Sequence, residues 1–205
     1  MTLEELYREA FSSFLENISD DLVSKLARYH SELLRWNRRV SLTALSRDEE
    51  VAAKLFFDSA AGLPFLQEDD VLLDLGTGPG FPGLVLALFR PEIPVLLAEV
   101  RTKKVAFLKR MRHVLGLERV IIVDRRVEGV QDLPEVPTAL TSKATGPPDE
   151  ILSLGRKLLR PDGRVILYSG KTPGKAEGFR LVTRSQYDLP FGFGRRVLQV
   201  FAREG

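Results

Sequence analysis

A glycine-rich turn between two apolar runs, each ending in an acid, constrains this chain more than any other feature. The run at 71–75 contains Asp74 near its end and leads into glycines at the alternate positions 76, 78 and 80. Nineteen residues after Gly80, a second apolar run, 95–98, is followed by Glu99. Glycines let a flat ligand lie against the main chain, and a carboxylate at a strand end suits a ribose diol. The pattern predicts the nucleoside-binding half of a doubly wound α/β sheet, and therefore a cofactor that contains a nucleoside.

Two classes of cofactor share this layout, and the prolines in the turn favour one of them. Residues 78–83 satisfy the dinucleotide fingerprint G-x-G-x-x-G, in which helix N–H groups bind a pyrophosphate. Pro79 and Pro82 have no N–H, so this turn is poor in donors for phosphate oxygens. Asp74 before the glycines, giving D-x-G-x-G-x-G, resembles the first motif of S-adenosylmethionine-dependent methyltransferases. That cofactor has no phosphate and carries a cationic amino-acid end, so we expect a methyltransferase more than a dehydrogenase.

Composition excludes several kinds of chemistry. The 205 residues suffice for one domain with an appended subdomain. There is no cysteine, which excludes disulfides, thiolate metal sites and cysteine nucleophiles, and the only two histidines fall in helical patterns. No apolar run approaches the roughly 20 residues that span a bilayer, and the acidic N-terminus is unlike a signal peptide. We expect a cytoplasmic protein without a metal, whose chemistry depends on positioning or on carboxylates, lysines and arginines.

The net charge is only +2, but basic residues are concentrated in two stretches. Residues 1–70 hold 8 basic and 14 acidic side chains. Residues 101–126 hold 9 basic and 2 acidic side chains, and residues 156–205 hold 11 basic and 4 acidic ones. Basic side chains can simply solvate helix faces. Two such stretches beside an acidic N-terminal part also suit a polyanionic partner such as nucleic acid.

Hydrophobic periodicity predicts three helices followed by an alternating β/α domain. The helices are expected at 3–15, 22–36 and 48–63, in an N-terminal helical subdomain of residues 1–66. Residues 67–205 are expected to form the cofactor-binding domain, a doubly wound, mostly parallel seven-stranded sheet with an antiparallel last strand. The predicted strands are 71–75, 94–99, 119–123, 138–142, 164–168, 179–188 and 197–203, and the helices between them are 81–89, 102–115 and 148–159.

Ligands of parallel sheets bind at the carboxyl ends of the strands, so the residues at those ends are the candidate site residues. The first two strands deliver Asp74 with the glycines, and Glu99. The third delivers residues 124–128 and the fourth delivers Thr141, Ser142 and Lys143. We expect all of them to converge on one crevice.

Five segments resemble the bacterial small-subunit ribosomal RNA guanine-N7 methyltransferases, the glucose-inhibited division protein B family. Residues 36–43 resemble its W-N-x-x-x-N-L-T segment and residues 57–59 the end of its H-x-x-D-S. Residues 74–83 match D-x-G-[ST]-G-x-G-x-P-G, residues 103–108 resemble K-K-x-x-F-L, and residues 126–128 match R-x-E. Their combined order, over roughly residues 30–170, makes the resemblance specific.

The resemblance implies a class I, Rossmann-like methyltransferase that uses S-adenosylmethionine to methylate N7 of a guanine in 16S ribosomal RNA. It implies ribosomal RNA or the small ribosomal subunit as partner, and we expect a monomer. Lys143 is the candidate catalytic residue, acting by positioning. The implied cofactor-binding residues are Asp74, Gly76, Thr77, Gly78, Gly80, Phe81, Pro82, Glu99, Val100, Arg126, Val127, Glu128 and Lys143.

Four positions depart from the family pattern on the substrate side. Leu55 stands where the family has the His of H-x-x-D-S, and Ser41 stands where it has the second Asn of W-N-x-x-x-N-L-T. Lys143 replaces the Arg of the family's S-R-A segment after strand four, and Ser169 replaces the Lys of its L-K-G segment after strand five. Lys143 keeps the charge but loses the planar, two-pronged donor of arginine. The cofactor is therefore better supported than the identity of the methylated base.

Guanine N7 carries an exposed lone pair in the neutral base, so its methylation needs positioning and no general base. Residues 145–149 also lack the Asn/Asp-Pro-Pro-aromatic motif that is usual for methylation of exocyclic amines. The alternatives are a small-molecule or protein methyltransferase and a divergent, inactive cofactor- or RNA-binding module. A dehydrogenase is disfavoured because Tyr168 and Lys171 are three residues apart, where short-chain enzymes use four.

Overall fold

A seven-stranded sheet organises the protein, and its order is β3-β2-β1-β4-β5-β7-β6. The structure is a computed structural model that describes residues 1–15, 17–174, 176 and 178–204. The strands are β1 Leu72–Leu75, β2 Val95–Ala98, β3 Val120–Val123, β4 Ala139–Ser142, β5 Arg164–Leu167, β6 Phe179–Asp188 and β7 Arg195–Arg203. The helices are α1 Leu3–Phe11, α2 Asp20–Asn37, α3 Asp48–Val51, η1 Ala52–Phe57, α4 Asp58–Ala60, η2 Leu63–Phe65, α5 Gly83–Phe89, α6 Thr102–Val114, η3 Val130–Asp132, α7 Pro148–Leu158 and η4 Pro190–Gly192.

The first five strands are parallel, and β7 runs antiparallel to both β5 and β6. β1, β2 and β4 are buried along their whole length, because helices cover both faces of the sheet. This arrangement confirms the predicted fold class. The last strand begins at Arg195 and not at 197, because the connection after β6 closes early: Leu189 N–H donates to the Gly194 carbonyl at 2.8 Å.

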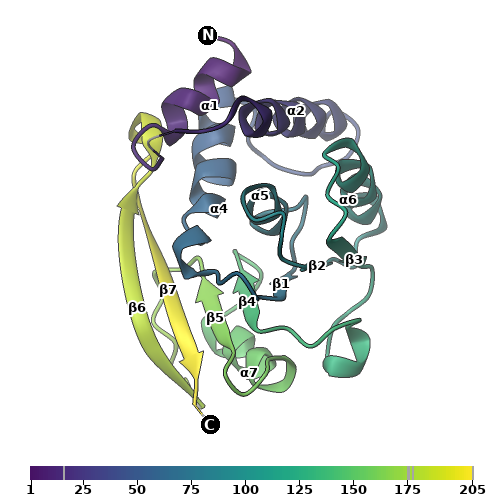
Figure 1. Cartoon of the computed structure of the whole chain (residues 1–205), viewed down its shortest axis with the longest axis vertical. Coiled ribbons are helices and arrows are strands. Elements are labelled where there is room, and N and C mark those ends of the chain that lie inside the picture. The colour runs from purple at the N-terminus through teal and green to yellow at the C-terminus, as the bar shows by residue number, and fades with distance from the viewer. Residues whose placement is uncertain (16, 175, 177, 205) are drawn as a thin grey trace.

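Alternate residues of the strands enter two different cores. Leu72 and Leu97 pack with α1, α2, α5 and α6 in the larger core, whereas Leu73 and Leu96 pack with α7 in the smaller one. Figure 1 shows the first group of helices above the sheet and α7 below it. The predicted domain boundary at 66/67 stays a prediction, and the larger core is shared across it.

The two N-terminal helices begin at side-chain caps. Thr2 and Glu5 form a capping box at α1, and Ser19 Oγ accepts from Leu22 N–H at α2. α1 ends at Phe11, earlier than the predicted residue 15.

The third predicted helix is interrupted by a π-helix, η1, between α3 and α4. Each π turn adds one residue, so the interruption changes which side chains face the core. Phe56, Phe57, Asp58 and Ser59 are all buried, a run that a regular helix of this kind would not bury on one face. The helix predicted at 48–63 is present over residues 48–60, with a π-helical centre that the sequence did not indicate, and Asp58 is buried in it.

Candidate active site

Strand register aligns the carboxyl ends of β1, β2 and β4. Asp74 lies opposite Leu97 of β2 and Thr141 of β4, and Glu99 and Lys143 come directly after those two strands. β1 and β4 are neighbours although they are not consecutive, so the chain leaves β1 toward one edge of the sheet and returns on its other side. Such a switch point is where doubly wound sheets bind ligands.

The turn after β1 has the backbone that its glycines predict. Gly76, Gly78 and Gly80 have φ of 65°, 60° and 105°, a region that side chains with a Cβ rarely adopt. Tyr29 of α2 holds the outside of this turn, because its hydroxyl donates to the Pro79 carbonyl at 2.6 Å. At Gly78 an added Cβ would meet nothing closer than Lys104 Nζ at 3.5 Å, so the backbone there is open to a ligand.

Asp74 is completely buried beneath this turn. Its Oδ2 accepts from Gly83 N–H at 2.7 Å, and a Cβ on Gly83 would lie 2.7 Å from the same oxygen. Asp74 Oδ1 and Thr77 Oγ1 are both buried without a hydrogen-bond partner among the described residues. Burial raises the pKa of the Asp74 carboxyl to about 7, against the lowering effects of the neighbouring Thr77 hydroxyl and of the hydrogen bond from Gly83. The two orphaned oxygens fit a cofactor that brings a cationic, hydrogen-donating end.

The raised pKa of Asp74 makes the stability of the protein depend on pH. The unfolded carboxyl releases its proton near pH 4 and the folded one near pH 7, so the free energy of unfolding should fall as pH rises through this window. The loss is roughly 1.4 kcal/mol for each unit that separates the two pKa values. Asp74→Asn removes the titration, so the difference between pH 5 and pH 8 in urea denaturation should shrink. Asp162→Asn, at an exposed turn, is the control; equal pH dependence in wild type and Asp74→Asn would contradict the assignment.

Glu99 is buried, and one of its carboxylate oxygens is already used by the protein. Oε1 accepts from the N–H groups of Val100 and Arg101 at 2.9 Å each, just before α6 begins. Oε2 lies 3.9 Å from Lys104 Nζ and has no shorter contact among the described residues. Only Oε2 is therefore fully available to accept from ribose hydroxyls.

Two residues near the turn were missed in the sequence. Lys104, only 18% exposed, lies between Gly78 and Glu99; its place within the K-K-x-x-F-L helix was the available signal. Thr145 covers Gly76, where a Cβ would collide with its side chain, and its hydroxyl donates to the Leu75 carbonyl at 2.9 Å. Nothing in the sequence around Thr145 indicates that contact, because it depends on how the loop after β4 folds back.

The remaining predicted cofactor residues differ in their surroundings. Phe81 is buried against Tyr29, with ring centroids 5.1 Å apart, and Pro82 is buried beside it, so both support the turn from the helical side. Val100 is 60% exposed, as an apolar residue facing a ligand would be. Arg126 and Glu128 pair with each other at 3.1 Å on the surface, and Val127 is buried in the smaller core. Among the described contacts none joins Arg126 or Glu128 to Asp74 or Glu99.

Lys143 is held by a buried carboxylate from the N-terminal helices. Its Nζ lies 2.6 Å from Asp58 Oδ2 and donates to the Lys54 carbonyl at 2.8 Å, within the π-helix. Asp58 also accepts from the Tyr187 hydroxyl at 2.6 Å. The Tyr168 ring lies 5.8 Å from the ammonium. Burial lowers the pKa of Lys143, and the Asp58 carboxylate opposes that shift.

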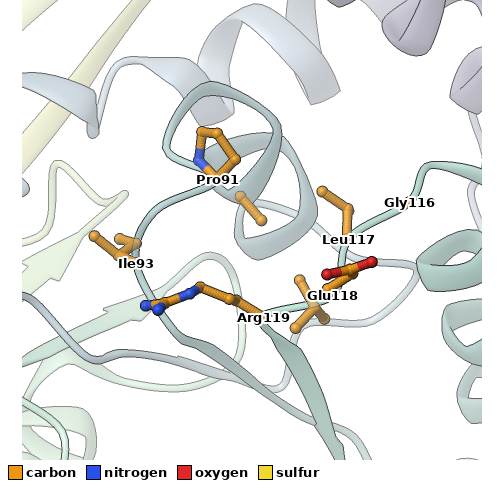
Figure 2. Close-up of a pocket in the computed structure, with 8 residues that line it drawn as sticks. Pro91, Ile93, Gly116, Leu117, Glu118 and Arg119 are labelled. Carbon is orange, nitrogen blue, oxygen red and sulfur yellow. The ribbon is translucent and has the colours of Figure 1, made fainter.

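Two hollows lie at opposite ends of the parallel strands. A cleft of about 640 Å³ opens at the carboxyl ends of β4 and β5. Ser142, Ala144, Tyr168 and Ser169 are among the residues that line it, and the intervening Lys143 is not. A smaller hollow of about 270 Å³, shown in Figure 2, lies at the amino ends of β2 and β3. Ile93 and Arg119 line it, and Arg119 donates to the Glu92 carbonyl at 2.7 Å. Only the first hollow lies at the edge where the sheet binds ligands.

The described part of the chain contains no group of three or more His, Asp or Glu residues placed to hold a metal ion. None of its helices is long and apolar enough to cross a membrane.

The sheet order, the open Gly-rich turn and the acid after β2 together define a Rossmann-like fold with a ligand site at the carboxyl ends of its strands. A solved S-adenosylmethionine-dependent methyltransferase from Aquifex aeolicus has the same fold, with a TM-score of 0.54 and 16% identity over 75% of this chain and 92% of that chain.

Comparison of the sequence gives the family. The model of rRNA small subunit methyltransferase G matches residues 22–178. The ribosomal RNA small subunit methyltransferase G of Myxococcus xanthus is 40% identical over 91% of both chains, and that of Geobacter sulfurreducens is 34% identical over 88% of both. The chain belongs to the rRNA small subunit methyltransferase G family, and its cofactor is S-adenosylmethionine.

Proposed function

We propose that this protein methylates N7 of a guanine in 16S ribosomal RNA. The observation that carries the proposal is the family relationship, which extends over most of the chain and over most of its relatives. We further propose that it acts as a monomer in the cytoplasm.

The proposed cofactor site follows the strand ends. Glu99 Oε2 binds the ribose hydroxyls, and the Gly78 backbone lies against the cofactor beside Lys104. The cationic methionine end lies toward Asp74, whose unpaired Oδ1 would gain a partner. A cation there favours the ionised carboxyl, so binding near pH 6 should be accompanied by loss of a proton from Asp74.

The residues of the chain bind the cofactor and the guanine and orient them for methyl transfer. When bound, S-adenosylmethionine supplies an electrophilic methyl group on its sulfonium. The neutral guanine presents the N7 lone pair, so no side chain has to remove a proton. The cleft of about 640 Å³ at the carboxyl ends of β4 and β5 is within the usual range for a small-molecule site and would admit the base. Lys143, fixed by Asp58, would hold the base or the methionine end in line.

The test is methylation in vitro of ribosomal RNA that has been isolated from a strain lacking this gene. Purified protein and S-adenosylmethionine should add one methyl group to RNA or small subunits from that strain, at an N7 site revealed by cleavage at 7-methylguanine. RNA from the parent strain should accept none. Transfer to another atom would refute the N7 assignment, and no transfer to RNA or to subunits would favour the alternatives.

A further inference from the structure

We propose that the carboxyl end of α2 is an RNA-backbone anchor, separate from the site of methyl transfer. The inference rests on the proposed RNA substrate and adds a surface that the charge distribution along the sequence did not indicate. Residues 1–70 are acidic overall, yet three of their six arginines, Arg35, Arg38 and Arg39, lie together at one end of one helix.

These arginines surround a hollow of about 390 Å³. Its lining consists of Arg35, Trp36, Arg38, Arg39 and Val40. Trp36 is half-buried and packs edge-to-face against Phe107 of α6, with ring centroids 5.5 Å apart. The indole is therefore fixed in place while part of it lines a hollow rimmed by guanidinium groups. Aromatic rings and arginines in this arrangement suit the stacked bases and phosphates of a single strand.

Two of the arginines have no acid to neutralise them. Arg38 and Arg39 are exposed and form no ion pair within the described residues. Arg35 pairs with Glu32 at 2.6 Å, and Arg110 of α6 lies 3.9 Å from the same carboxylate. Cations at a helix end also stabilise the helix dipole, but that effect needs neither the hollow nor the indole. The surplus positive charge at the hollow is complementary to a phosphate backbone.

The anchor continues onto α6 and is rigidly connected to the cofactor turn. Arg110 of α6 is exposed and lies 3.9 Å from Glu32 of α2, and Figure 1 shows α6 beside the end of α2. Tyr29, on the same helix, donates to the Pro79 carbonyl of the turn. Trp36 is seven residues farther along α2, roughly 10 Å at 1.5 Å per residue. RNA held at this end of α2 would therefore lie at a fixed distance from the cofactor turn, because one helix joins the two.

Trp36 is the only tryptophan in the chain, so its fluorescence reports on the anchor directly. Titration with 16S ribosomal RNA should change Trp36 emission and reverse with salt. In Arg38→Ala/Arg39→Ala, the KM for RNA should rise about tenfold with kcat unchanged. The slope of log affinity against log salt should become shallower by about 1.4, for two lost phosphate contacts on a single strand. Affinity for S-adenosylmethionine should not change.

Arg8→Ala/Arg47→Ala is the matched control, because it removes two exposed arginines from the same acidic N-terminal part without touching the residues that line the hollow. Equal effects of the two double variants, or unchanged Trp36 emission at saturating RNA, would overturn the anchor. The fluorescence titration requires no catalysis. A wild-type protein that binds RNA through Trp36 but methylates nothing would therefore refute the proposed function and leave the anchor standing.

Discussion

Glu99→Gln is expected to weaken binding of S-adenosylmethionine about 10- to 150-fold, because losing a hydrogen bond to a charged group costs roughly 1.5–3 kcal/mol. The glutamine carbonyl can still accept from Val100 and Arg101, so the start of α6 should remain intact. Its amide would replace Oε2 as a donor, facing Lys104 and the ribose hydroxyls. Calorimetric titration measures the loss.

Glu99→Ala separates the two roles of the carboxylate. It removes the acceptor for α6 as well as the proposed ribose ligand, so it should lower both affinity and thermal stability. Glu118→Ala, exposed at the opposite edge of the sheet, should change neither. Unchanged affinity in a folded Glu99→Gln protein would remove Glu99 from the cofactor site.

Lys143→Ala is expected to slow single-turnover methyl transfer about a hundredfold, since a misplacement of about 1 Å can have that effect. It would also leave Asp58 as a buried, unpaired carboxylate, and breaking a buried ion pair costs about 3–5 kcal/mol. Lys143→Arg restores the family residue and should retain activity. A positioning cation predicts a flat pH–rate profile from pH 6 to 8.5. A tenfold rise per pH unit that disappears in Lys143→Arg would show that the lysine is a general base.

A double variant distinguishes a structural clamp from a group that acts on the substrate. Asp58→Asn/Lys143→Met removes both charges and keeps similar volumes, so much of the stability lost in Lys143→Ala should return. If the only role of Lys143 is to connect the π-helix to the end of β4, the double variant should recover the methyl-transfer rate together with the free energy of unfolding. We expect stability to recover while the rate stays low, with kcat affected more than KM. Tyr187→Phe, which removes one hydrogen bond to Asp58, should have a smaller effect on both.

Local sequence determined the sheet domain and its cofactor. Short apolar runs that end in acids indicate the strands, and a Gly-rich turn and helical patterns lie between them. All of these signals are local in the sequence. Parallel pairing then brings the ends of β1, β2 and β4 to one edge whatever the rest of the chain does. The backbone of the turn was likewise predictable, because glycines at 76, 78 and 80 permit the positive φ that the structure has.

Only the tertiary structure decided how those ends are completed. The π-helix brings Asp58 into contact with Lys143, 85 positions later in the chain, and with Tyr187 of β6. Thr145 folds back over Gly76, and Glu99 uses one oxygen to start α6. Arg38 and Arg39 become a basic surface because α2 ends beside α6. The contacts of Asp58 and Thr145 join residues far apart in the chain, so packing between elements determines which groups complete the site.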